Sequence, residues 1–152
     1  MLKKMKKAFT ITELVIVIAV IAILAAVLIP TFTTVVNNAN ESAAMQETKS
    51  EWTNCSAEIV TTVNASDMNY LIVHKGYAFI IFNGNLDVDP VMENATGAVT
   101  NVEYNGTTYT ATSIYGFNED GTEVTDSGAT PTGYEFSSGF DVYSLEAQVS
   151  NP

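Results

Sequence analysis

The apolar residues divide the chain into a continuous apolar segment, a one-sided helical segment and a β-rich remainder. Leu14–Ile29 is an uninterrupted run of 16 apolar residues, which would extend about 24 Å as an α-helix. Counted from Phe9, such a helix reaches about 32 Å, close to the roughly 30 Å thickness of a bilayer hydrocarbon core. The pattern therefore predicts a membrane-spanning helix over residues 9–30, with Glu13 inside it near one face of the membrane.

From Phe32 onward the apolar positions become one-sided. They recur mostly at intervals of three and four residues, which is typical of an amphipathic helix, and they are Phe32, Val35, Val36, Ala39, Ala43, Trp52, Cys55, Ile59 and Val63. We expect residues 31–63 to continue the same helix outside the membrane, with an apolar seam on which a sheet can pack. Pro30 has no amide hydrogen to donate, so it predicts a kink in this helix.

The remainder, residues 64–152, alternates β-forming runs with turns. Asn69–His74 and Tyr77–Phe82 flank Lys75-Gly76 and predict a hairpin. Further strands are expected at residues 108–115, 134–136 and 140–145, whereas residues 91–107 show little pattern. The predicted fold class is α+β: a long N-terminal helix whose outer half packs on a small antiparallel sheet. Residues 64–152 are expected to form one exported, β-rich globular head.

Four lysines precede the apolar run, and one carboxylate lies at its start. The positive-inside rule keeps the lysine-rich end in the cytoplasm and the C-terminal part outside. A carboxylate in a membrane-spanning helix is costly unless it is paired, and a plain anchor gains nothing from it. Cleavage between Ala8 and Phe9 would create an α-amine four residues from Glu13, on the same chain or on a neighbour, with which the carboxylate could pair. An uncleaved anchor or an ordinary secretory signal peptide remains an alternative.

Residues 3–36 closely resemble the N-terminus of type IV prepilins and pseudopilins. In that family a basic leader ends at a small residue, a Phe follows, and a Glu and a Pro lie fifth and twenty-second when that Phe is counted first. Here the corresponding residues are Ala8, where the family usually has Gly, then Phe9, Glu13 and Pro30. The resemblance implies a leader over residues 1–8, cleavage between Ala8 and Phe9 by a prepilin peptidase, and N-methylation of Phe9. It also implies that Glu13 pairs with the Phe9 amine of an adjacent subunit.

The same resemblance implies a structural function rather than an enzymatic one. The chain would be a single-pass precursor in the cytoplasmic membrane, with its C-terminus outside, and then a subunit of an extracellular type IV pilus-like filament. Its partners would be membrane lipid before assembly, identical or related pilin subunits afterwards, the prepilin peptidase, and an assembly ATPase with a platform protein. The alternatives are a pseudopilin of a type II secretion or DNA-uptake system, and a membrane-anchored exported binding domain that does not polymerise.

The charges beyond the leader are strongly unbalanced. The chain has no arginine, and after residue 8 two lysines, Lys49 and Lys75, stand against 17 carboxylates, so that 2 − 17 = −15. Because phosphate binding needs a basic surface, direct binding of nucleic acid is not expected. The single cysteine, Cys55, excludes an intrachain disulfide and is expected to be a small buried residue on a helix.

Candidate chemistry in the predicted head is sparse. Asn85, Asp87 and Asp89 alternate within a turn-rich segment and faintly resemble the start of a calcium loop. The glycine and glutamate that such a loop needs at its sixth and twelfth positions are missing, so a plain turn is the preferred interpretation. His74 is the only histidine, no partner for it is evident, and it is expected to be structural. No motif of a nucleophilic triad, phosphate loop or zinc site occurs, so neither a cofactor nor an enzymatic activity is predicted.

Overall fold

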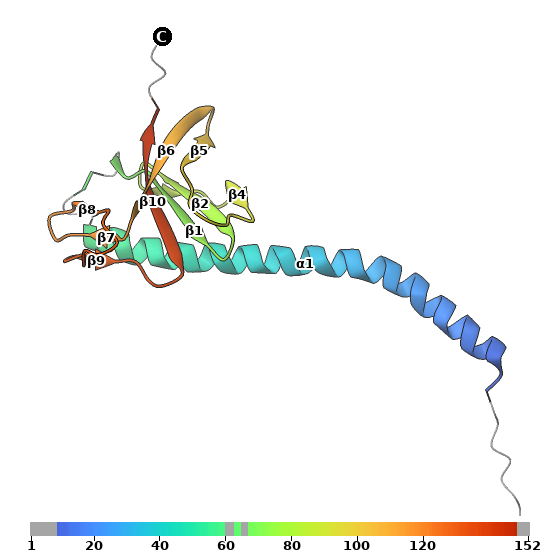
Figure 1. Cartoon of the computed structure of the whole chain (residues 1–152). Helices are drawn as coiled ribbons and strands as arrows, with labels where there is room; N and C mark the ends of the chain where they lie inside the picture. Colours follow the sequence, from blue (N-terminus) through green and yellow to red (C-terminus); the bar gives the residue numbers. More distant parts are fainter. Residues whose placement is uncertain (1–8, 60–62, 65–66, 149–152) are drawn as a thin grey trace, which may run out of the picture. The chain divides into compact units, whose positions relative to one another are not determined.

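One long helix dominates the N-terminal part of the protein (Figure 1). The computed structural model describes residues 9–59, 63–64 and 67–148, and the chain divides into two compact units, Met1–Asn40 and Glu41–Pro152. Helix α1 extends over Ile11–Ile59, 49 residues, and continues through Pro30. The prediction of one continuous helix beyond the apolar run is confirmed, whereas Ala8 and the rest of the leader lie outside the described residues.

In the first unit, α1 presents its apolar side chains to the surroundings. Every large apolar side chain from Phe9 to Val36 is exposed, and none of the most apolar 18-residue window is buried. By length and composition this window could cross a membrane. The expected apolar seam was wrong here, because Phe32, Val35 and Val36 are exposed as well.

In the second unit, α1 has a buried face that begins at Ala44. Its members recur at intervals of three and four residues, as one face of a helix requires, and they are Ala44, Thr48, Glu51, Trp52, Cys55 and Ile59. The prediction was right for Trp52, Cys55 and Ile59. It was wrong for Ala43, which is exposed, and it missed the polar Thr48 and Glu51.

The second unit is built on an antiparallel sheet with the strand order β3-β2-β1-β10-β6-β5, and β4 also pairs with β2. The strands are β1 (Tyr70–His74), β2 (Tyr77–Phe82), β3 (Asn85–Leu86), β4 (Met92–Glu93), β5 (Asn101–Tyr104), β6 (Thr107–Ile114) and β10 (Phe140–Ala147). A smaller sheet has the order β8-β7-β9, formed by Glu123–Val124, Gly116–Phe117 and Tyr134–Glu135. The α+β class is therefore confirmed.

Three two-residue turns set the registers of the larger sheet. They are Lys75-Gly76, Asn83-Gly84 and Asn105-Gly106, and all six residues have positive φ, as a type I′ hairpin turn requires. The first turn confirms the predicted hairpin. The other two turns join β2 to β3 and β5 to β6, and the sequence analysis predicted neither pair of strands. An Asn-Gly pair between β-forming runs is the signal that could have predicted both hairpins.

The larger sheet is buried on both faces, which explains why all five residues of β1 are buried. Tyr70, Ile72, Ile81, Ile114 and Val142 form one core with Trp52, Cys55, Ile59, Met68 and Phe117. On the other face the buried residues are Leu71, Val73, Ala78, Ile80, Val102, Tyr109, Tyr143 and Leu145. Partly buried residues of the segment that includes β4, among them Val91, Met92, Ala95 and Val99, pack against this second core.

A buried carboxylate joins α1 to the connection between β9 and β10. Glu51 is 6% exposed, and its Oε1 accepts hydrogen bonds from the Tyr134 hydroxyl at 2.9 Å and from the Ser137 amide at 2.8 Å. Burial and this contact raise the pKa of Tyr134. Burial also raises the pKa of the neighbouring Cys55 thiol to about 12, so the expected small, unreactive cysteine is confirmed as a buried free thiol.

We predict that Glu51→Ala destabilises the second unit by about 2 kcal/mol, because the substitution leaves partly buried donors without their acceptor. Denaturant unfolding of the detergent-solubilised full chain, followed through its single tryptophan, would measure the loss. Glu58→Ala is the matched control, since Glu58 lies exposed on the same helix. An equal effect of the two substitutions would contradict the role given to Glu51.

Candidate functional site

The first turn of α1 is closed by a reciprocal pair, Thr10 and Glu13. The Thr10 amide donates to Glu13 Oε2 at 2.9 Å, and the Thr10 hydroxyl donates to the same oxygen at 2.8 Å. In return, the Glu13 amide donates to Thr10 Oγ1 at 3.2 Å. This is a capping box, in which a Thr just before the helix and a Glu three residues later satisfy each other's free backbone donors. Glu13 therefore has a use even in a helix that only anchors the chain.

This role of Glu13 was not predicted, although the sequence carries a signal for it. The pattern Thr-x-x-Glu directly before an apolar helical run is the usual signature of a capping box, and residues 10–13 match it. Both hydrogen bonds from Thr10 end on Oε2, and within the described residues Oε1 accepts no hydrogen bond. Among the residues that the structure describes, the capping box thus uses only one of the two carboxylate oxygens.

Phe9 lies next to this capping box and is 81% exposed. Its amide is the position that cleavage after Ala8 would convert to an α-amine, one residue from Thr10. The structure therefore brings together Phe9, Thr10 and Glu13 at the start of α1, whereas Ala8 lies outside the described residues.

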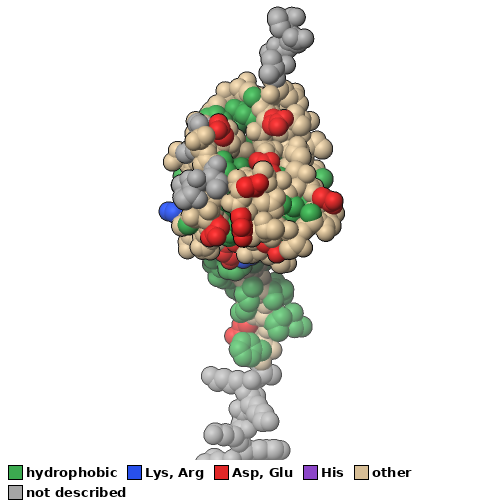
Figure 2. Space-filling view, turned by 90° about the vertical axis from the view of Figure 1, so that its left-hand side faces the viewer, with side chains coloured by type: hydrophobic (Ala, Val, Ile, Leu, Met, Phe, Trp, Pro, Cys, Tyr) green, Lys and Arg blue, Asp and Glu red, His purple; other side chains and the backbone are tan. Residues whose placement is uncertain are grey.

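From Leu14 to Ile29 the surface of α1 is apolar. Figure 2 shows hydrophobic side chains gathered along the helix. Four small residues, Ala19, Ala22, Ala25 and Ala26, lie within the apolar run and would let another helix approach its backbone closely, as small residues do in helix pairs within membranes.

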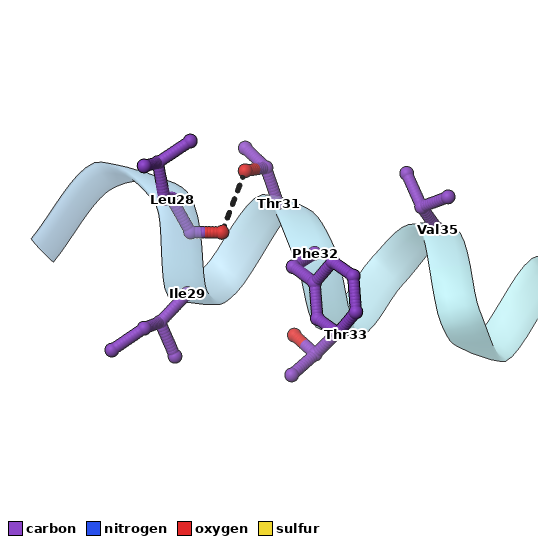
Figure 3. A pocket seen from close by; sticks show the side chains of 6 residues that line it. All are labelled: Leu28, Ile29, Thr31, Phe32, Thr33 and Val35. Atoms are coloured by element: carbon purple, nitrogen blue, oxygen red, sulfur yellow. Dashed lines mark hydrogen bonds between the residues drawn. The ribbon is translucent and has the colours of Figure 1, made fainter. Parts of the chain in front are cut away.

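Around Pro30, three threonine hydroxyls bond to backbone carbonyls. The hydroxyl of Thr31 donates to the Leu28 carbonyl at 2.9 Å, and those of Thr33 and Thr34 donate to the Pro30 carbonyl at 2.8 and 3.1 Å. Pro30 itself cannot donate to the carbonyl four residues earlier. Leu28, Ile29, Phe32 and Val35 line a hollow on the helix surface here (Figure 3). A helical ladder that already lacks one backbone bond is easier to bend, and a kink at Pro30 stays a prediction.

The candidate calcium residues form hydrogen bonds with other groups of the protein. Asp87 Oδ2 accepts from the Tyr104 hydroxyl at 2.9 Å, which raises the pKa of Tyr104. Its Oδ1 lies 3.4 Å from the Asp89 amide, and the Asn85 amide group donates to the Asn83 carbonyl. Among the residues that the structure describes, no group of three or more His, Cys, Asp or Glu side chains is placed to hold a metal ion.

Acidic side chains are scattered over the second unit. Figure 2 shows several of them on the face in view, together with a basic side chain at its edge. His74, expected to have no partner, contacts Glu47 of α1 and the Gly139 carbonyl. These partners lie 27 and 65 residues away in the chain, a separation at which local sequence patterns carry no signal.

We predict that Thr10→Val weakens the first turn of α1, because valine keeps the shape of threonine but loses its hydroxyl. Losing a threonine cap costs about 1 kcal/mol, so amide hydrogen exchange of residues 12–14 in detergent micelles should become about fivefold faster. Thr10→Ser retains the hydroxyl and should leave exchange nearly unchanged. Equal protection in the two variants would show that the capping box does not hold this turn.

Comparison with known proteins gives one match, and it falls on this end of the chain. The family described as prokaryotic N-terminal methylation motif matches residues 3–29. No curated protein and no solved structure matches the chain. The matched segment contains the four lysines of the leader, Phe9, the capping box and the whole apolar run Leu14–Ile29. The chain therefore carries a type IV prepilin-type cleavage and methylation motif, the mark of a membrane-anchored pilin-like or pseudopilin-like precursor.

Proposed function

We propose that this protein is a structural subunit of a type IV pilus-like filament. In this proposal, prepilin peptidase cuts the precursor between Ala8 and Phe9, and the new Phe9 amine is methylated. The mature helix then leaves the membrane and packs against identical or related subunits in an extracellular filament, driven by an assembly ATPase and a platform protein. The chain itself performs no catalysis.

The observation that carries the proposal is the uncovered apolar helix of the first unit. Its large apolar side chains from Phe9 to Val36 are exposed in the described part of the chain, which is why lipid or other helices are expected around them. Lipid satisfies this need in the precursor. Once the helix is withdrawn from the membrane, the apolar helices of neighbouring subunits can satisfy it instead, with the alanines allowing close packing.

Glu13 supports assembly over simple anchoring. A carboxylate inside an apolar environment needs a cation or several donors. Thr10 supplies two donors to Oε2, which accounts for part of this need in the isolated chain. In the filament, the methylated amine of a neighbour's Phe9 would supply the cation, directed at Oε1. Such a buried pair fixes the axial register between subunits, because only one offset brings amine and carboxylate together.

Glu13→Gln separates the two roles of this residue. Glutamine can complete a capping box as glutamate does, but it has no charge with which to pair. We predict that the variant is inserted and cleaved normally, keeps the hydrogen-exchange protection of the first helical turn, and yields several-fold less filament in the fraction sheared from cells. Immunoblots of the sheared and membrane fractions would measure this.

Glu41→Gln is the matched control, since it removes a charge from the same helix outside the apolar run. It should assemble like the unmodified protein. Normal assembly of Glu13→Gln would contradict the charge pairing. Absence of the unmodified protein from every sheared fraction would favour the non-polymerising anchored domain or a pseudopilin.

A further inference from the structure

His74 lies between two hydrogen-bond acceptors in the second unit. Its Nδ1 is 2.8 Å from the Gly139 carbonyl oxygen, and its Nε2 is 2.5 Å from Glu47 Oε2. The residue is only 7% exposed. A carbonyl oxygen can only accept, and an ionised carboxylate can only accept, so both ring nitrogens must carry a proton to complete the two bonds.

The alternative arrangement is a neutral ring that accepts a proton from a protonated Glu47. Lys75 argues against it. The Lys75 Nζ is 2.6 Å from Glu47 Oε1, and an ammonium group beside a carboxyl stabilises the ionised form. The contacts with Lys75 and then with His74 lower the pKa of Glu47. These contacts favour the ionised carboxylate, and the geometry then requires the proton of the Glu47 contact to lie on the His74 ring.

The ring connects three parts of the second unit that are distant in the chain. His74 ends β1, Glu47 belongs to α1, and Gly139 directly precedes β10. The Phe140 ring lies parallel to the imidazole, with a centroid separation of 3.9 Å and an interplanar angle of 9°, and an imidazolium above an aromatic face gains a cation–π attraction. Glu51 bonds the same β9–β10 connection through Ser137. Two glutamates one turn apart on α1 thus hold residues 137–140.

We propose that His74 is a pH-sensitive clasp that holds the β9–β10 connection against α1 while its imidazole is protonated. When the ring loses a proton, one nitrogen presents a lone pair to an acceptor, and one of the two hydrogen bonds becomes a repulsive contact. The charge attraction to Glu47 and the cation–π contact with Phe140 are lost in the same step. The clasp therefore weakens as the pH rises.

Glu47 determines how the clasp responds to a falling pH. Because its pKa is lowered in the folded protein, its contribution to stability is present above the ordinary pKa of a glutamate and is lost as the pH falls through the lowered value. The Glu47 contribution to the clasp is therefore lost in acidic solution. Glu47 and Lys75 form the ion pairs at this place, and the titratable Tyr77 lies opposite His74 on β2. This inference concerns the second unit alone and does not depend on filament assembly.

Nitrogen NMR of the imidazole ring tests the proposal directly, because His74 is the only histidine and its signals are unambiguous. The full chain, labelled with ¹⁵N-histidine and held in detergent micelles, would be measured at about pH 7, where an exposed histidine is mostly neutral. We expect both ring nitrogens to show the protonated, imidazolium signature. A neutral ring with one unprotonated nitrogen would overturn the proposal.

A matched pair of variants identifies the partner. Glu47→Gln should lower the imidazolium fraction at about pH 7 several-fold, whereas Glu58→Gln, which removes an exposed charge from the same helix, should leave it unchanged. The Tm of the full chain should fall as the pH is raised, and this fall should disappear in Glu47→Gln but persist in Glu58→Gln. An unchanged imidazolium fraction in Glu47→Gln would also overturn the assignment. Should that variant fail to fold, the spectrum of the unmodified chain still decides.

Discussion

The central constraint on this protein is that half of its helix has no apolar partner of its own. Burying one large aliphatic side chain is worth about 1.5–3 kcal/mol, and the run Leu14–Ile29 exposes such side chains around its whole circumference. The helix can exist only in lipid or among other helices. Under the proposed function, the basic leader, the apolar run and the single carboxylate at its start belong to a segment that moves from the first environment to the second.

Polar side chains form hydrogen bonds at two defined places along this otherwise apolar helix. Thr10 and Glu13 close its first turn through hydrogen bonds to one carboxylate oxygen, and the hydroxyls of Thr31 and Thr33 bond to the carbonyls of Leu28 and Pro30. In the second unit, polar contacts hold a connection between strands against the helix. Its only cysteine is a free, buried thiol, so Glu51 and the Glu47–His74 pair hold the β9–β10 connection on α1 without a disulfide.

Most of the architecture follows from local patterns in the sequence. The apolar run, its continuation as a helix, and the hairpin at Lys75-Gly76 all arise from residues close together in the chain, and they were predictable. The Asn-Gly turns and the Thr-x-x-Glu cap were equally local but were overlooked. The Glu51–Tyr134 and Glu47–His74 contacts could not be predicted, because they depend on which sheet residues reach α1. The seam was misplaced for the same reason: spacing shows that a helix has an apolar side, but only the sheet determines where burial begins.

The most direct test of this account is the intact mass of the protein in filaments sheared from cells. The account predicts a species that begins at Phe9, carries one added methyl group on its amine, and ends at Pro152. This result would establish cleavage, methylation and assembly at the surface together. A chain found only in the membrane and still beginning at Met1 would contradict it, and would leave a simple anchor as the function of the apolar helix.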